Sequence, residues 1–227
     1  MAKSAETKQE TRRYKSPRRK EQAEATRRQI LDGAERLFIK DGYVATSMAA
    51  IAKEAGVALK TVYLAFETKS GLLRALWHRN LRRGREDVPV GQQDWFLEVL
   101  EEPDPARALR LNARNSRRVK TRIAPLGEVI LTAAAADPEI DALSRRIWSQ
   151  FYDNQRDVVK ALNRRRALKR GLSVDRAADI LWTLNHPRTY LLLLEDRGWT
   201  PEEYERWLGD ITIAELLKES ERSRTRK

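Results

Sequence analysis

The sequence predicts an all-α protein. Apolar residues recur at intervals of three and four along most of the chain, which is the spacing of one face of a helix. Ser, Thr or Asp precedes several of these stretches, often with Pro in the next position, as at helix N-termini. No stretch between turn residues alternates apolar and polar side chains as a half-buried strand does.

The first predicted helix occupies residues 26–41. Thr26 is a suitable N-cap, and Asp41-Gly42 ends the helix because glycine readily adopts the positive φ found after a helix. Residues 1–24 are highly charged and nearly free of large apolar groups, so we expect them to be disordered. This basic segment is either a mobile arm on a polyanion or a plain solvated tail. The inward face of the helix comprises Ile30, Leu31, Ala34, Leu37 and Phe38.

Two short helices follow, separated by a tight turn. Thr46 is predicted to cap the second helix, and Gly56 permits the close approach of the second and third helices. Val62 and Phe66 are spaced four residues apart, which turns one face of the third helix inward. Two short helices around a glycine turn are typical of a helix-turn-helix.

The rest of the chain is predicted to form further amphipathic helices. Asp104-Pro105 and Asp137-Pro138 read as caps followed by first-turn prolines, and Thr200 to Glu203 reads as a capping box. Pro187 is expected to kink or break an apolar segment. The expected ranges are 69–85, 94–101, 105–122, 126–136, 138–169, a helix starting at 173, and 201–218.

The positive charge of the chain is concentrated in its first third. The net charge is +12; residues 1–84 hold 19 Lys and Arg against nine Asp and Glu, whereas residues 85–227 hold 26 against 24. A basic region concentrates near a polyanion because neutralising phosphates releases condensed counterions. The predicted helix-turn-helix lies in this basic part, so the sequence favours binding to DNA.

Several classes of protein are not expected. The chain has no cysteine, which excludes disulfides and thiolate metal sites and fits a reducing cytoplasm. No apolar run approaches the roughly 20 residues needed to span a bilayer, and the N-terminal residues do not resemble a secretory signal. With two histidines and no evident nucleophile–base pair, we expect no metal site, no cofactor and no enzymatic activity.

Over about 50 residues the chain resembles the tetracycline-repressor (TetR) family of bacterial regulators. The resemblance lies in TRRQILDGAERLFIKDGYVATSMAAIAKEAGV followed by TVYLAFETKSGLL. It implies a helix-turn-helix domain at residues 25–68, a larger helical domain for effector binding and dimerisation at 69–219, and a charged tail at 220–227. The matching elements are Gly42-Tyr43, Thr46-Ser47, Ile51-Ala52, Ala55-Gly56-Val57, Tyr63 to Phe66, and Lys69.

The resemblance implies a set of DNA-contacting residues. Lys60 and Thr61 would reach base edges or neighbouring phosphates. The contacts to phosphates would come from Thr46, Ser47, Tyr63 and Lys69. Tyr63 is alternatively an aromatic group that shields the core, with its hydroxyl only solvated. The family often has Ser, Gly and His where this chain has Ala58, Lys60 and Leu64, so the reading surface is less polar. Leu59 would contact a thymine methyl group, and Leu64 either does the same or packs on a neighbouring helix. The full expected set is Thr46, Ser47, Ala58, Leu59, Lys60, Thr61, Tyr63, Leu64 and Lys69.

The resemblance gives the C-terminal region two roles. In the family the last two long helices of each subunit form a four-helix bundle, which implies a homodimer here through segments 177–194 and 207–217. The family's ligand cavity implies contacts from bulky and polar residues, which are alternatively ordinary core. The dimer candidates are Ile180, Leu181, Leu184, Leu191, Leu192, Leu208, Ile211 and Leu216. The cavity candidates are Asn112, Arg114, Asn115, Trp148, Phe151, Tyr152 and Trp182.

The resulting hypothesis is a cytoplasmic, dimeric transcriptional repressor. It would bind a palindromic DNA operator and be released by a small-molecule effector. The alternative is a basic protein that compacts nucleic acid without sequence preference. The alternative predicts a steep salt dependence, no preferred site, and loss of binding when residues 1–24 are deleted.

Overall fold

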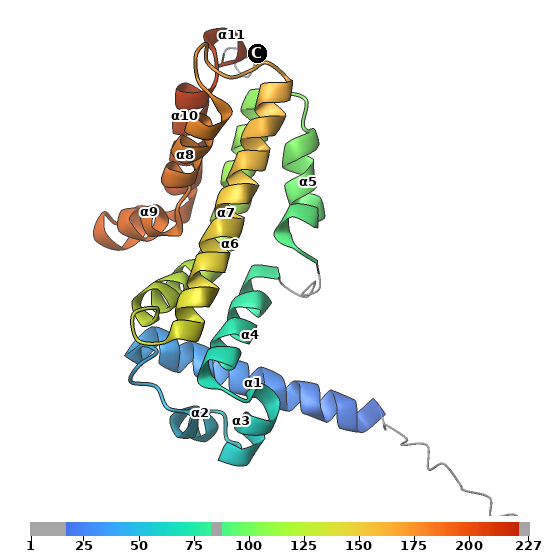
Figure 1. The fold of residues 1–227 in the computed structure, drawn as a ribbon, viewed down its shortest axis with the longest axis vertical. Helices are drawn as coiled ribbons and strands as arrows, with labels where there is room; N and C mark the ends of the chain where they lie inside the picture. Colours follow the sequence, from blue (N-terminus) through green and yellow to red (C-terminus); the bar gives the residue numbers. More distant parts are fainter. Residues whose placement is uncertain (1–16, 83–87, 223–227) are drawn as a thin grey trace, which may run out of the picture.

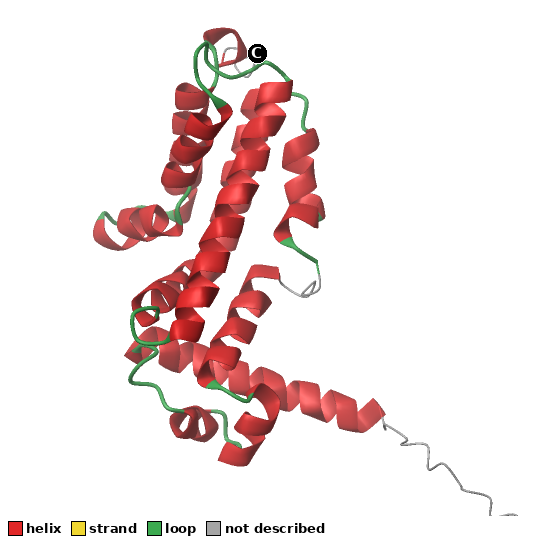
Figure 2. Cartoon of the chain, in the orientation of Figure 1, coloured by secondary structure: helices red, strands yellow, loops and turns green. Residues whose placement is uncertain are grey.

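The computed structural model describes residues 17–82 and 88–222. These residues fold into helices and connecting loops without a strand (Figure 2), apart from an isolated antiparallel bridge between Leu168 and Leu217. The all-α prediction is confirmed. Each helix in the described ranges is too short or too polar to cross a membrane.

Four helices form one end of the molecule (Figure 1). The two short helices α2 and α3 lie outermost, below α1, and α4 connects them to the rest of the chain. The bounds are α1 (Pro17–Asp41), α2 (Met48–Glu54), α3 (Leu59–Phe66) and α4 (Lys69–Arg82).

The larger region is built around two long helices that run side by side along the molecule. The first of them, α6, also packs against α10, α9 and α5, and it reaches α1 and α4 at its C-terminal end. The elements of the larger region are η1 (Val90–Gln92), α5 (Asp94–Glu101), α6 (Pro105–Ala133), α7 (Pro138–Arg164), α8 (Val174–Leu184), α9 (Pro187–Leu191), the π-helical turn η2 (Leu192–Asp196), α10 (Pro201–Leu216) and α11 (Glu219–Arg222).

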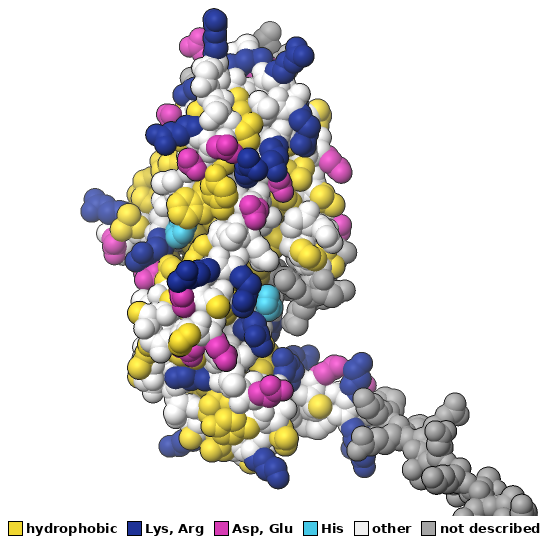
Figure 3. All heavy atoms as spheres, in the orientation of Figure 1, with side chains coloured by type: hydrophobic (Ala, Val, Ile, Leu, Met, Phe, Trp, Pro, Cys, Tyr) yellow, Lys and Arg dark blue, Asp and Glu magenta, His cyan; other side chains and the backbone are white. Residues whose placement is uncertain are grey.

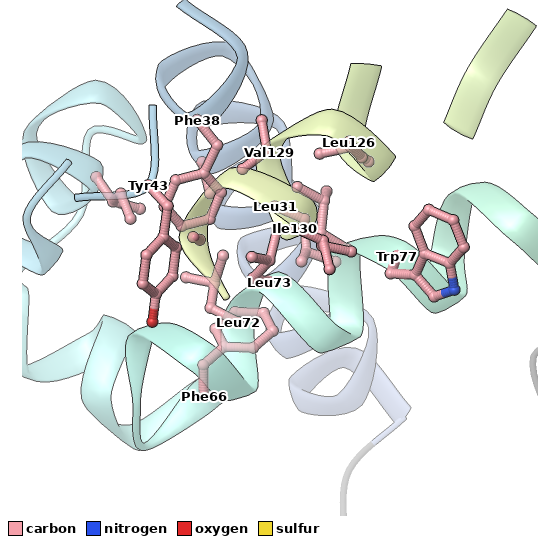
Figure 4. Close-up of a cluster of buried hydrophobic side chains, with 14 of the residues drawn as sticks. Leu31, Phe38, Tyr43, Phe66, Leu72, Leu73, Trp77, Leu126, Val129 and Ile130 are labelled. Atoms are coloured by element: carbon pink, nitrogen blue, oxygen red, sulfur yellow. The ribbon is translucent and has the colours of Figure 1, made fainter. Parts of the chain in front are cut away.

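The hydrophobic core of the first four helices continues into the long helices. Phe38 and Tyr43 pack with Leu72 of α4, and Leu126 and Ile130 of α6 complete the same cluster (Figure 4). A second core joins α5, α6, α7, α8 and the end of α10. Because α6 contributes to both cores, it connects the helix-turn-helix end to the rest of the protein.

Most predicted caps are confirmed. The carboxylates of Asp104 and Asp137 accept backbone N–H bonds at the starts of α6 and α7, and the Ser173 hydroxyl does so at α8. Thr200 and Glu203 form a complete capping box at α10. Thr46 is not a cap: the Ser47 hydroxyl accepts from the Ala50 N–H and caps α2 instead.

The boundaries differ from the predictions in four places. The first helix starts at Pro17 instead of 26, so residues 17–24 are helical, while residues 1–16 lie outside the described residues. The predicted break between 122 and 126 is wrong, because α6 continues through Pro125. The next helix ends at Arg164 instead of 169. At the C-terminus, a short helix, α11, covers part of the predicted tail.

Candidate DNA-binding surface and central cavity

The helix-turn-helix is held by a small set of buried side chains. Gly56, between α2 and α3, has φ of +67°, a conformation that side chains with a Cβ rarely adopt. Ile51 on α2 and Val62 on α3 have no exposed surface, and Phe66 is also buried. The Arg27 guanidinium stacks on the Phe66 ring at 4.1 Å and donates to the Ala65 carbonyl, which fixes the end of α3 against α1.

The opposite face of α3 points outward. Leu64 is 77% exposed and Tyr63 is 48% exposed, while Lys60 and Leu59 are also on the surface and Thr61 is half-buried. The interpretation in which Leu64 packs on a neighbouring helix is therefore wrong. The space-filling view shows hydrophobic side chains gathered at this end of the molecule, over α2 and α3, with basic side chains beside them (Figure 3).

Positions 46, 47 and 58 differ in what they offer a ligand. Thr46 is buried and its hydroxyl donates to the Gly42 carbonyl at 2.7 Å, so its side chain does not reach the surface. The Ser47 side chain is exposed while it caps α2. Ala58 is the exposed N-cap of α3 and makes no side-chain cap, so no side-chain hydroxyl competes for the backbone N–H groups at the start of this helix.

Lys69 has an internal role at the start of α4. Its ammonium donates to the carbonyls of Tyr43 and Thr46 at 2.8 and 3.0 Å, and it lies 4.2 Å from the centre of the Tyr43 ring. Burial lowers the pKa of Lys69, although nearby Asp137 opposes that shift. The amine therefore ties the loop before α2 to α4.

Hydrogen bonds that sequence analysis missed join this domain to the start of α7. The buried Tyr43 donates its phenol proton to Asp137 at 2.5 Å, and Ser70 donates to Glu139 at 2.5 Å. The bond from Tyr43 holds the pKa of Asp137 below its usual value, and two backbone N–H bonds act in the same direction. On the other side of α4, Arg79 pairs with two acids of α1.

A cavity of about 430 Å³ lies between α4, η1, α5, α6 and α7. Three of the predicted lining residues are there: Asn112, Trp148 and Phe151. The other four serve the surrounding structure. Arg114 pairs with Glu98 at 3.9 Å, Asn115 donates to the Trp95 carbonyl, Tyr152 donates to Asp179, and Trp182 packs edge-on against His186.

The cavity also includes residues that sequence analysis did not select. Trp77, Trp95 and Phe96 supply further aromatic wall, and Lys120 contributes a fully buried amine. Lys120 lies eight residues after Asn112 on the same helix, so helical spacing places both on one face. That spacing was visible in the sequence, but the burial of a lysine depends on helices far away along the chain.

The predicted dimer surface is partly used inside the subunit. Leu181, Leu208 and Leu216 are buried in the subunit's own cores, so they are not available to a partner chain. Leu192 is 56% exposed. The remaining candidates, Ile180, Leu184, Leu191 and Ile211, are half-buried.

Comparisons with known proteins agree with this geometry. Residues 30–76 match the family model described as bacterial regulatory proteins, tetR family. The probable HTH-type transcriptional regulator ArpR of Pseudomonas putida is 31% identical over 175 residues, which cover 71% of this chain and 77% of that protein. The HTH-type transcriptional regulator AcrR of Shigella flexneri is 27% identical over 207 residues, covering 88% of this chain and 86% of that protein.

Among solved structures, NalD of Pseudomonas aeruginosa, the secondary repressor of the MexAB-OprM multidrug efflux pump, has the same fold. The TM-score is 0.68 with 23% identity, over 87% of this chain and 99% of NalD. The helix-turn-helix, the second helical region and these likenesses lead to one conclusion. The chain belongs to the TetR family of bacterial regulatory proteins and is a DNA-binding transcriptional regulator.

Proposed function

We propose that this protein is a cytoplasmic, dimeric repressor that leaves its operator when a small molecule fills the central cavity. The observation that carries the proposal is the outward face of α3. Its inner residues Val62 and Phe66 are buried, while Lys60, Tyr63 and Leu64 stand exposed at the tip of the molecule. A recognition helix held in this way enters a major groove with its polar and apolar side chains against base edges.

The exposed groups have distinct roles in this proposal. Lys60 and Thr61 contact base edges or adjacent phosphates, and Tyr63 contacts a phosphate through its hydroxyl. Leu59 and Leu64 contact thymine methyl groups, because an apolar side chain cannot hydrogen-bond to a base edge but can pack against the methyl group. The side chain of Ser47 and the backbone N–H groups at Ala58 and Lys69 approach phosphates, as helix N-termini favour anions.

Dimerisation sets the form of the operator. The partly exposed apolar residues of α8, α9, η2 and α10 supply the pairing surface, with Leu192 of η2 as its most exposed apolar member. A two-fold dimer presents two recognition helices about 34–36 Å apart, which is one turn of duplex DNA. The operator is then expected to be roughly palindromic.

The cavity provides the route to release. It is bounded by α4, which packs on α1 and α3, by α6, which packs on α1 and α4, and by α7, whose start accepts the hydrogen bonds from Tyr43 and Ser70. A ligand that binds a conformation with misplaced recognition helices lowers operator affinity by its differential affinity for the two states.

Fluorescence anisotropy on a promoter fragment from the gene's own neighbourhood, against a scrambled duplex, tests this proposal. Preference for the promoter fragment at moderate salt is expected, and equal affinity for both duplexes contradicts sequence-specific binding. Lys60→Ala and Tyr63→Ala are each expected to weaken operator binding by about 1–3 kcal/mol. Lys160→Ala, on α7 and away from α3, is the matched control and keeps wild-type affinity.

A further inference from the structure

Lys120 is a buried amine at the wall of the cavity. Its side chain, on α6, is 2% exposed and lines the cavity with Asn112 and Ser116 of the same helix. The ammonium donates to the Asn185 side-chain oxygen and, at 3.0 Å, to the Tyr204 hydroxyl. An ammonium group has three N–H donors, so one donor remains beyond these two bonds.

The residues around Lys120 do not neutralise its charge. Among residues 17–82 and 88–222, no carboxylate forms an ion pair with Lys120, and the nearby ion pairs are made by arginines instead. Burial lowers the pKa of Lys120 well below its ordinary value, and burial together with Lys120 and Arg188 lowers the pKa of His186 to about 4. Two further titratable groups from the facing helices lie on this side: the phenol of Tyr204, which accepts from Lys120, and the phenol of Tyr190, whose ring packs against Tyr204.

The polar groups beside the amine are already held in fixed positions. Asn185 accepts from Lys120 with its oxygen and donates with its amide nitrogen to Ser116 and Gln155, both at 2.9 Å. Ser116 and Gln155 line the cavity as well. The amine is therefore surrounded by polar groups that hydrogen bonds hold in place. Asp153 is the acid among the cavity residues, and it lies on the exposed side of α7.

The rest of the cavity wall is aromatic. Trp77 of α4 and Trp95 of α5 face Trp148 and Phe151 of α7, whose rings meet edge to face at 6.4 Å. Gly127 of α6 lies against the Trp148 ring, so a Cβ there would stand 3.6 Å from it. A space of about 430 Å³ with such walls accommodates a flat, apolar body the size of a drug molecule.

We propose that the cavity binds an aromatic organic acid, whose carboxylate is held by Lys120 and whose rings lie among the tryptophans. A charge-assisted hydrogen bond is strong where water is excluded, and a carboxylate supplies the acceptor and the negative charge that the buried amine lacks. This inference rests on the proposed function, because it names the chemical class of the effector.

Matched ligands test the inference in the wild-type protein. The probes are aryl carboxylates of different shapes (2-naphthoate, biphenyl-4-carboxylate and anthracene-9-carboxylate), each beside its uncharged carboxamide. Isothermal titration calorimetry is expected to show the best carboxylate binding about 10- to 100-fold more tightly than its carboxamide, the range for one buried charge-assisted bond. Carboxamides that bind as tightly as their acids, or a panel in which no acid binds, would overturn the proposal.

Substitution assigns the preference to one side chain. Lys120→Met keeps the length of the side chain without its charge and is expected to remove the preference for the acid, whereas Lys160→Met on the outer part of α7 retains it. Lys120→Gln serves if the methionine variant does not fold. An acid preference that survives in the folded variant refutes the role of Lys120.

The operator assay separates this inference from the proposed function. An aryl acid that binds through Lys120 but leaves operator affinity unchanged supports the binding site and contradicts the effector role. Release of the operator by carboxamides and acids alike supports the effector role and contradicts the preference for an acid.

Discussion

Replacing Tyr43 by Phe removes a single oxygen at the junction between the DNA-binding helices and α7. The ring stays in its core, where Tyr43 is 5% exposed and packs against Phe38 at 5.6 Å between ring centres. The bond lost is the 2.5 Å donation to Asp137, which lies 94 residues away along the chain. The substitution therefore removes this long-range bond, together with the weaker interaction of the hydroxyl with Ser70, with little change in volume.

The expected cost follows from the partners of this bond. Hydrogen bonds to charged groups contribute about 1.5–3 kcal/mol to stability. Asp137 is half-buried, and its other oxygen keeps its bonds to the N–H groups of Glu139 and Ile140. Because water can solvate the released oxygen, we expect Tyr43→Phe to lower the free energy of unfolding by about 1.5–2 kcal/mol at pH 7.

This cost depends on pH in a defined direction. The folded-state pKa of Asp137 is lower than its unfolded value, so the bond contributes its full stability above the unfolded pKa of about 4. The contribution is lost as the pH falls through the folded-state pKa. Urea denaturation at pH 7 and pH 3 should therefore show a smaller difference between wild type and variant at pH 3 than at pH 7.

An NMR titration of the Asp137 carboxyl group gives a second measurement, since its pKa should rise in the variant. Tyr152→Phe is the matched control: its hydroxyl also donates to an aspartate, Asp179, but at 3.2 Å on the surface. The control should cost under about 0.5 kcal/mol. Equal losses at both pH values, or an unchanged pKa of Asp137, would refute the reasoning.

Three further predictions concern separate parts of the fold. Gly71→Ala should destabilise the protein by about 1–3 kcal/mol in urea denaturation, because the new Cβ would lie 2.8 Å from the Phe66 carbonyl oxygen; a variant as stable as wild type contradicts that clash. Thr200→Ala breaks the capping box of α10 and should cost about 1 kcal/mol in the same assay, and no loss would show that the cap is dispensable. Replacing operator thymines by deoxyuridine removes their methyl groups and should weaken wild-type binding more than binding by Leu64→Ala, which keeps only the contact from Leu59; equal losses in both proteins exclude a methyl contact by Leu64.

Local sequence signals were sufficient for most of the fold. Asp104, Asp137 and Thr200 mark helix starts because a cap depends on residues within one turn of it. Thr46 shows the limit of such reasoning. Two adjacent hydroxyl residues both fit the cap, and the choice of Ser47 follows from the burial of Thr46 against the preceding helix.

The break predicted between residues 122 and 126, around Pro125, is wrong for a similar reason. Proline removes a backbone donor and usually ends a helix, yet α6 continues because Ala124 and Leu126 on either side are buried in the packed interior. Tertiary packing outweighs the local cost there. The cavity residues follow the same rule: Lys120 lies on the same helix face as the predicted Asn112, but its burial comes from Asn185 and Tyr204, which are 65 and 84 positions away.

The long helix α6 carries the cavity residues Asn112 and Ser116 near its start and the core residues Leu126 and Ile130 near its end. A single residue inserted between these groups would rotate everything after it by about 100°, since an α-helix has 3.6 residues per turn. Leu126 and Ile130 would then leave the core beneath the helix-turn-helix. Descendants of this protein are thus free to exchange side chains along that segment but not to change its length, so new ligand preferences must arise by substitution and not by insertion or deletion.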